Sequence, residues 1–174
     1  YDLDPLEVTL PTGFVKAGRW MTTGGTTIAI RQPHQVAVLA DFCNECGNCV
    51  TFCPTAGRPW RDKPRLYLDR REFEAEADNA FRMFRDQQVW ILQARWAGHT
   101  HEIMLNHDLR YHAPGLKLEL DAKTLAVRKS STSLRDGTTI SLAACAAMVA
   151  LLRGLRDSAA YLPVAELADK SELR

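Results

Sequence analysis

Four of the five cysteines in this chain fall within eleven residues and are followed directly by a proline. They are Cys43, Cys46, Cys49 and Cys53, in the pattern C-x2-C-x2-C-x3-C-P. Thiolates three residues apart on a tight loop can converge on the corners of a cubane, and this spacing is that of bacterial iron–sulfur ligand runs. Structural zinc sites usually separate two C-x-x-C pairs by a dozen or more residues, which this run does not do. The spacing therefore predicts a [4Fe–4S] cluster as cofactor, held by these cysteines.

Residues beside the cysteines fit the same prediction. Gly47 gives the loop backbone freedom and room for close approach to the inorganic sulfides. Pro54 is expected to end the loop, because proline fixes φ and lacks a backbone donor. Phe42 and Phe52 flank the run, and we expect them to form an apolar shell that keeps water from the cluster.

The sequence leaves three possibilities for the fourth ligand of the cluster. In two-cluster ferredoxins the last cysteine of such a run ligates the other cluster, so Cys53 could serve a cluster outside this chain. Cys53 could instead complete the local cluster. Alternatively Cys145 could do so, although its surroundings favour a buried residue of an apolar helix.

The cysteine run and its surroundings resemble a known family. The segment from Asp41 to Pro54, with the residues from Gly57 to Lys63, resembles the C-terminal ferredoxin-like region of YgfK-type iron–sulfur flavoenzymes. These large proteins are described as selenate reductase subunits, and are similar in layout to the small subunit of glutamate synthase and to dihydropyrimidine dehydrogenase. The resemblance implies a fragment or a subunit of a larger oxidoreductase, with a flavoprotein region or subunit as partner and, if Cys53 ligates externally, a second cluster-bearing segment.

Composition limits the remaining classes of partner. The net charge is +1 and charged residues make up 25% of the chain, which does not indicate nucleic acid binding. The chain has no apolar run of about 18–20 residues and no visible export signal, so we expect no membrane association. Thiols that must stay reduced predict a cytoplasmic protein.

The expected fold class is α+β, with a ferredoxin-like module at residues 1–86 and a small companion domain at 87–174. The first 25 residues are expected to be loops with short strands, and the cluster loop to follow a hairpin of residues 26–31 and 35–40. Helical spacing predicts a helix at residues 71–85. An antiparallel sheet is expected from residues 88–95, 101–106, 116–121 and 124–128, covered by one C-terminal helix at residues 140–155.

Two further clusters of side chains have two interpretations each. The histidines of the second half, His99, His101, His107 and His112, either bind a metal or are ordinary solvated residues, and their spacing favours the second. The basic residues after the cysteines are Arg58, Arg61, Lys63 and Arg65. They either form a positive collar that raises the cluster potential or docks an acidic partner, or they pair with nearby carboxylates.

The function that follows from these observations is electron transfer. The chain has no Gly-rich phosphate-binding sequence, so any flavin would lie on a partner or in a region outside this chain. No catalytic site is readable in the sequence. The alternative function is a structural or interaction domain in which the cluster only stabilises the fold.

Overall fold

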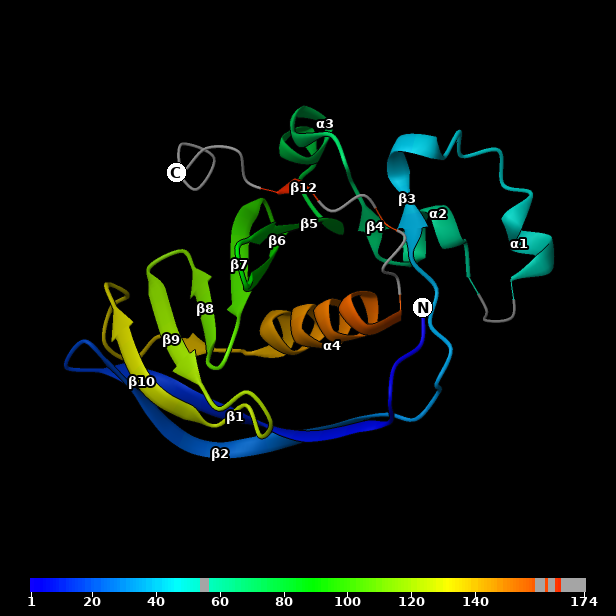
Figure 1. Cartoon of the computed structure of the whole chain (residues 1–174). Helices are drawn as coiled ribbons and strands as arrows, with labels where there is room; N and C mark the ends of the chain where they lie inside the picture. The colour runs from blue at the N-terminus through cyan, green and yellow to red at the C-terminus, as the bar shows by residue number, and fades with distance from the viewer. Residues whose placement is uncertain (54–56, 159–161, 163–164, 167–174) are drawn as a thin grey trace.

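The computed structural model describes residues 1–53, 57–158, 162 and 165–166. Pro54, which we expected to end the cysteine loop, lies outside the described residues. The protein is a mixed α/β structure made mostly of strands in two open sheets, with one long helix near the C-terminus (Figure 1). The mostly β composition and the C-terminal helix agree with the expected fold class.

The smaller sheet is an antiparallel arrangement in the order β11-β1-β2. Its strands are β1 (Leu6–Lys16), β2 (Arg19–Ile30) and β11 (Thr139–Ile140). A two-residue turn joins β1 to β2, and both of its residues, Ala17 and Gly18, have positive φ angles of 50° and 68°. Such turns match the right-handed twist of the flanking strands and so favour a long hairpin.

The larger sheet has the order β10-β9-β8-β7-β6-β5-β4-β3, with β12 beside β5. Its strands are β3 (Val38–Leu39), β4 (Arg65–Leu66), β5 (Ala80–Asp86), β6 (Val89–Trp96), β7 (His99–Leu105), β8 (Leu109–Ala113), β9 (Leu116–Leu120), β10 (Val127–Thr132) and β12 (Ala165–Glu166). Neighbours from β5 to β10 are antiparallel, and for the part from β6 onward this is the arrangement expected from the sequence. The edge that carries β3 and β4 is parallel.

The long helix α4 (Ala143–Ser158) lies between the two sheets and contacts β6, β7 and β1 (Figure 1). Its inward face is apolar, and Met148 and Leu152 are fully buried. The main core combines this face with side chains from both sheets, among them Val15 and Leu92. We expected this helix at residues 140–155; it begins three residues later and continues past Gly154 to Ser158.

Two expectations for the first 40 residues of the chain are wrong. Residues 1–25 form most of the long β1–β2 hairpin instead of loops with short strands. Residues 26–31 and 35–40 do not pair with each other, because the first segment pairs with β1 while Val38 and Leu39 pair with β4. Both segments contain strand residues, as their β-rich composition predicted, but long-range pairing sets the partner of each strand.

The expected helix at residues 71–85 is also wrong over most of its length. A short helix α3 (Arg70–Ala75) begins after Asp69, whose carboxylate accepts hydrogen bonds from the backbone N–H groups of Arg71 and Glu72. The remainder forms β5, which pairs with β6 and β4. Asn79 separates the two elements in a left-handed conformation with φ 51°. Tertiary pairing of Ala80–Asp86 therefore overrides a helical apolar spacing.

The domain boundary proposed between residues 86 and 87 stays a prediction. The β5–β6 ladder crosses it, and the main core contains side chains from both sides. A shared core does not establish which segments can fold alone.

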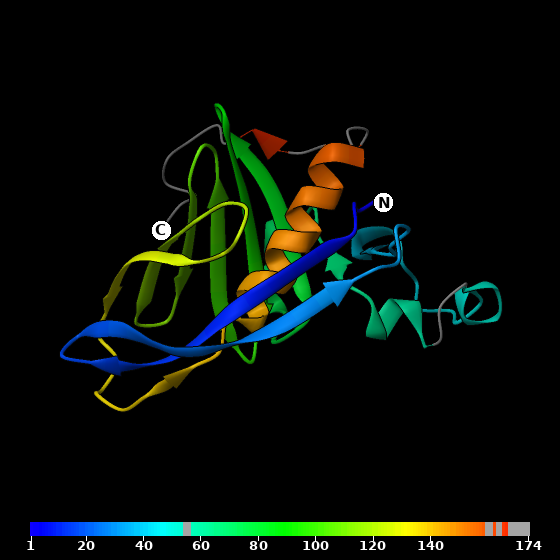
Figure 2. The same ribbon diagram turned by 90° about the horizontal axis from the view of Figure 1, so that it is seen from below.

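The cysteine run lies in the connection from β3 to β4. That connection projects from the edge of the large sheet. It contains the short helices η1 (Ala40–Phe42), α1 (Cys49–Phe52) and α2 (Pro59–Asp62). Figures 1 and 2 both show α1 at one side of the molecule, away from the two sheets and α4. The cysteine run is thus placed on a peripheral loop of a well-packed scaffold.

Candidate functional site

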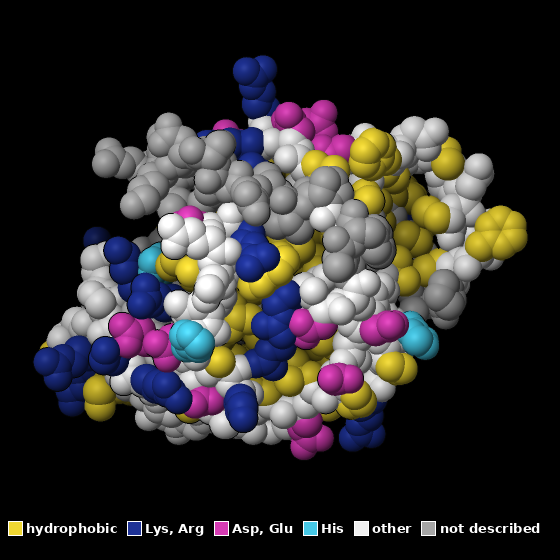
Figure 3. Space-filling model, viewed as in Figure 1, with side chains coloured by type: hydrophobic (Ala, Val, Ile, Leu, Met, Phe, Trp, Pro, Cys, Tyr) yellow, Lys and Arg dark blue, Asp and Glu magenta, His cyan; other side chains and the backbone are white. Residues whose placement is uncertain are grey.

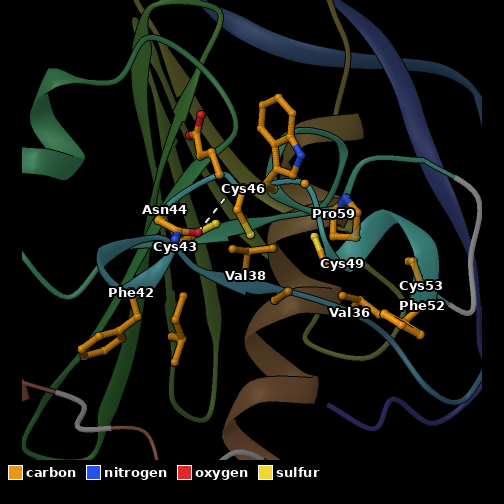
Figure 4. Close-up of a pocket in the computed structure, with 15 residues that line it drawn as sticks. Val36, Val38, Phe42, Cys43, Asn44, Cys46, Cys49, Phe52, Cys53 and Pro59 are labelled. Carbon is orange, nitrogen blue, oxygen red and sulfur yellow. Dashed lines mark hydrogen bonds between the residues drawn. The ribbon is translucent and has the colours of Figure 1, made fainter.

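All four cysteines of the run line one hollow of about 470 Å³. Its wall is formed by β3 and the residues before it, by the end of η1, by the cysteine loop, by both ends of α1 and by the start of α2. Figure 4 shows Cys43 and Cys46 on one side, Cys53 on the other and Cys49 between them. Cys46 and Cys49 are exposed, whereas Cys43 and Cys53 are half-buried.

The loop between the first three cysteines depends on two residues in the left-handed region. Glu45 has φ 53° and Gly47 has φ 81°. The side chain of Asn44 supports the first of these turns, since its Oδ1 accepts a hydrogen bond of 3.3 Å from the N–H of Cys46 (Figure 4). Glycine adopts positive φ without steric cost, which explains the choice of Gly47. Glu45 has a side chain and therefore carries strain in the same region of φ.

Asp41 fixes the start of the cysteine loop to the large sheet. Its carboxylate accepts hydrogen bonds from the backbone N–H of Leu68 at 2.8 Å and of Asp69 at 2.9 Å. Both donors follow β4, so the bonds tie η1 to the next connection. The residue after η1, Cys43, donates its N–H to the carbonyl of Ala40 at 2.9 Å, which sets where the first thiol leaves this anchored turn.

Asn79 fixes the other end of the site. Its side-chain amide donates to the carbonyls of Arg61 at 2.9 Å and Lys63 at 2.8 Å. These two carbonyls lie at the end of α2, which Pro59 begins. Proline at the first helical position is favourable because its missing N–H would have no partner there. Helix α2 is therefore held against the start of β5.

Of the basic residues after the cysteines, Arg61 and Arg65 form ion pairs with carboxylates. Arg65 contacts Glu45 of the cysteine loop at 3.5 Å and Glu76 at 3.2 Å. Glu76 also accepts a hydrogen bond of 2.7 Å from the hydroxyl of Tyr67. Burial, and then this hydrogen bond, raise the pKa of Tyr67 well above its usual value. Arg65 thus links the cysteine loop to the sheet.

Arg61 and Arg58 use a second carboxylate. Arg61 donates to Asp62 at 2.8 Å, and the backbone N–H of Arg58 donates to the same carboxylate at 2.7 Å. The hydrogen bond from Arg61 lowers the pKa of Asp62. For Arg61 and Arg65, these contacts favour the interpretation of paired side chains over a free positive collar.

The apolar shell expected around the cysteines is not formed as expected. Phe42 and Phe52 line the rim of the hollow, yet their side chains are 77% and 84% exposed, and Val50 is 43% exposed. In Figure 4 the ring of Phe42 points away from the cysteines. Figure 3 shows hydrophobic side chains gathered on the side that carries α1, whereas Lys and Arg gather mainly over β8 to β10. The prediction of an apolar shell was wrong because the burial of a side chain depends on which other residues pack over it.

Trp60 was not singled out as a functional residue by the sequence, and it lines the hollow from α2. Its ring is half-buried, but its indole Nε1 is fully buried and has no hydrogen-bond partner among the described residues. Buried tryptophan N–H groups usually have a partner. No sequence pattern indicates an unpaired indole N–H, because the tertiary surroundings of a donor decide whether it has a partner.

Cys145 lies in α4 within the main core and is 1% exposed. Burial raises the pKa of its thiol to about 12, so it stays protonated at neutral pH. The lining of the hollow does not include it. This placement matches the buried apolar interpretation and argues against Cys145 as the fourth ligand.

The histidines of the large sheet do not form a metal site with other residues in the described part of the chain. Nδ1 of His101 lies 2.7 Å from the hydroxyl of Tyr111, and Nδ1 of His112 lies 3.8 Å from Glu102. Burial lowers the pKa of both imidazoles. His99 and His107 are exposed. The interpretation as ordinary side chains is therefore favoured, although two of them are half-buried.

The four thiols have the chemistry of a soft-metal or iron–sulfur site, but they are not gathered into a finished ligand set. Within the described residues, no three His, Cys, Asp or Glu side chains are grouped closely enough to hold a metal ion. The thiols have the donor chemistry that an iron–sulfur cluster needs, and all four line the same hollow.

Comparisons with known proteins give a partial match. The chain is similar to "Putative oxidoreductase YgfK" of Escherichia coli K12, with 34% identity over 65 residues, and equally to the protein of that name from Escherichia coli O157:H7. The matches cover 33% of this chain and about 6% of the length of these relatives. No family model matches the chain, and no solved structure matches it significantly. The similarity supports a relationship to oxidoreductases.

None of the helices in the described part of the chain is both long enough and apolar enough to cross a bilayer.

Proposed function

We propose that this chain is an electron-transfer module that holds a [4Fe–4S] cluster at the hollow, through Cys43, Cys46, Cys49 and Cys53. The observation that carries the proposal is that all four thiols of an iron–sulfur spacing line a single hollow. Such a cluster, when bound, takes up and releases one electron at a time. The cysteine loop would be the ferredoxin-like part of the protein, with the sheets and α4 as its scaffold.

The proposed setting is a larger cytoplasmic oxidoreductase in which a flavin lies on a partner or on a region outside this chain. The relatives support this setting, because they are named as oxidoreductases and are far longer than the matched segment. The position of the site supports it as well. Cys46 and Cys49 are exposed on a peripheral loop, so an electron donor or acceptor can approach them without crossing the core.

A structural role for the cluster is the second candidate, and one observation favours it. No residue from 41 to 53 is buried. A segment without a core of its own relies on its anchors and on whatever it binds, and metal binding then contributes directly to local folding. In this case the cluster would order the loop without cycling between redox states.

The metal content tests both candidates. We expect the chain, purified without oxygen, to be brown and to contain iron and acid-labile sulfide in equal amounts. Cys46→Ser should remove the cluster, because a serine hydroxyl is mostly protonated and is a poor ligand at neutral pH. Reversible reduction by a low-potential donor would support the relay. Loss of iron before any reversible cycle would support the structural role, and a colourless protein with one zinc would contradict both.

Two further cysteine variants serve as controls in the same assay. Cys145→Ser should keep its iron, because Cys145 lies in the core and away from the hollow. Cys53→Ala separates the two remaining solutions for the fourth ligand. Loss of iron would place Cys53 on the local cluster. Unchanged iron would show that the local cluster does not need Cys53, and damage to a different cluster in the intact assembly would then assign Cys53 to a cluster outside this chain.

A further inference from the structure

The outer edge of β2 is a long strand edge that pairs with no other strand among the described residues. Strand β2 is the last in the order β11-β1-β2, and Figures 1 and 2 both show it at the border of the molecule. Strand β11 pairs with β1 at Gly13 and Phe14. Over residues 6–11 of β1 and 25–30 of β2, the described part of this sheet therefore has two strands. Two-stranded ribbons are marginally stable, and a third strand usually stabilises them.

The sequence of this edge lacks the usual protection of an exposed strand. Edge strands of folded proteins often carry charged side chains or proline, which prevent pairing with another chain. From residue 21 to residue 30, β2 contains neither, and all of these residues are exposed except Ile28 and Ile30, which are half-buried. The facing segment of β1 does contain a charge, at Glu7, and a proline, at Pro11. The outer edge of β2 is therefore suited to pair with a further strand.

The pairing with β1 indicates which backbone groups of β2 point outward. Pro11 has no N–H, and a proline within a sheet lies where its backbone nitrogen faces away from a paired strand. Because Pro11 is opposite Gly25, the backbone N–H and C=O of Gly25 point away from β1. Every second residue repeats this orientation, so Thr27 and Ala29 point outward as well. The hydroxyl oxygens of Thr27 and Thr9 lie 3.0 Å apart, as expected for the closer side chains of such a pair.

We propose that the outer edge of β2 pairs antiparallel with the same edge of a second copy of this chain. With Ile28 at the centre, Ile28 of one copy lies beside Ile28 of the other, and Thr27 lies opposite Ala29. β-Branched apolar side chains stabilise such cross-strand pairs. Ile28 already packs against the main core, so the contact extends the apolar inner face of the sheet. A two-fold axis closes the pair, because each copy provides one edge.

The charges around β2 favour a second copy as the occupant of this edge. Arg31 follows the strand and would lie opposite Gly25 of the other copy, which has no side chain, and Arg19 lies outside the paired segment. No like charges therefore face each other across the two-fold axis. Complementary charge is a main means of selecting a foreign partner, and residues 21–30 offer no charge for it. An uncharged edge is complementary to an identical uncharged edge.

The mass of the full chain in solution tests this pairing. Sedimentation at micromolar concentrations should give the mass of two chains, and a dilution series gives the dissociation constant of the dimer. Amide hydrogen exchange at Thr27 and Ala29 should slow as the dimer forms, because their N–H groups become paired. The inference does not depend on the proposed function, so it can fail while electron transfer stands, and the reverse.

Thr27→Lys and Thr9→Lys form a matched pair of variants. Both remove the contact between the two hydroxyls and add one positive charge, but only Thr27 lies on β2. Thr27→Lys places two like charges diagonally across the contact, so the dissociation constant should rise about tenfold. Thr9→Lys should leave it unchanged. Ala29→Pro removes one outward donor from each copy without loss of a bond to β1, and should weaken the dimer by a similar factor.

Three results would overturn the inference. The first is the mass of one chain at every micromolar concentration; slow exchange of Thr27 and Ala29 in that monomer would show that another segment of this chain covers the edge. The second is a dimer that persists unchanged in both Thr27→Lys and Ala29→Pro, with circular dichroism confirming that the variants fold, which would place the contact elsewhere on the molecule. The third is a mass that grows beyond two chains, because a two-fold axis closes the contact.

Discussion

The α4 layer and the cysteine loop differ in what holds them in place. Helix α4 presents an apolar face to two sheets, with Met148 and Leu152 fully buried. In the cysteine segment, residues 41–53, no residue is buried, and the segment is held by the hydrogen bonds that the Asp41 carboxylate accepts and by the contact of Glu45 with Arg65. Helix α4 is stabilised by the burial of apolar surface, and the cysteine segment by a few polar contacts.

This difference separates the region that stabilises the fold from the region proposed to bind the cluster. A closely packed core resists changes of shape, whereas a peripheral loop with few contacts can adjust around a bound group. The hollow lies at the junction of the two, with Trp60 on an anchored helix and the exposed cysteines on the loop. Substitutions should therefore separate global stability from metal binding.

The largest effect is expected from a truncation in α4. Leu152→Ala removes buried methyl groups and leaves a cavity, so the free energy of unfolding should fall by about 2–5 kcal/mol. Denaturant unfolding followed by circular dichroism measures it. The matched change in the other region is Phe52→Ala, which should shift stability by less than ~0.5 kcal/mol because the ring is 84% exposed. Equal losses in the two variants would refute the comparison.

An intermediate and local effect is expected from Asp41→Asn. The amide keeps one acceptor but turns an NH2 group toward a backbone donor, so at least one of the bonds to Leu68 and Asp69 is lost. Amide hydrogen exchange should speed up severalfold around β3 and η1, with little change in the β5–β7 strands.

The control for this variant is Asp136→Asn, which removes a carboxylate that accepts from the N–H of Ala17 at the β1–β2 turn. It should leave exchange in the cysteine segment unchanged. Faster exchange throughout the molecule in Asp41→Asn would show that this loop is part of the global folding unit.

The smallest effect is expected from pH and should be confined to the sheet. Burial, and then the charge of His99, lower the pKa of His101 in the folded protein, so the unfolded state takes up the proton first as pH falls. This contribution to stability is complete above about pH 6.5 and is lost as pH falls through the folded pKa. The denaturation midpoint should therefore decrease on the acid side, and less so in His101→Gln.

His107→Gln, on the exposed turn between β7 and β8, is the matched histidine control. The cysteine segment contains no histidine, so iron content should not follow the same curve. A steeper acid loss of stability in His101→Gln than in the unaltered chain would contradict the assignment.

Local patterns predicted the second half of the chain better than the first. The segments 88–95, 101–106 and 116–121 largely coincide with β6, β7 and β9. In the last of them, the alternation of apolar and polar residues is the direct pattern of a half-buried strand. Strand β8 was missed, and the helical spacing at 71–85 predicted the wrong element for β5. Ala80–Asp86 form a strand because they pair with neighbouring strands, and the sequence of one segment cannot show this pairing.

The sequence by itself determined the kind of chemistry available, because ligand type and spacing are covalent properties of the chain. The run from Cys43 to Cys53 specifies soft sulfur donors on one loop wherever that loop lies. Tertiary structure alone decided that this loop lies at the β3 edge, that Phe42 and Phe52 face outward, that Cys145 lies in the core and that the N–H of Trp60 has no partner among the described residues. These are properties of burial and pairing, which arise only when segments distant in sequence pack together.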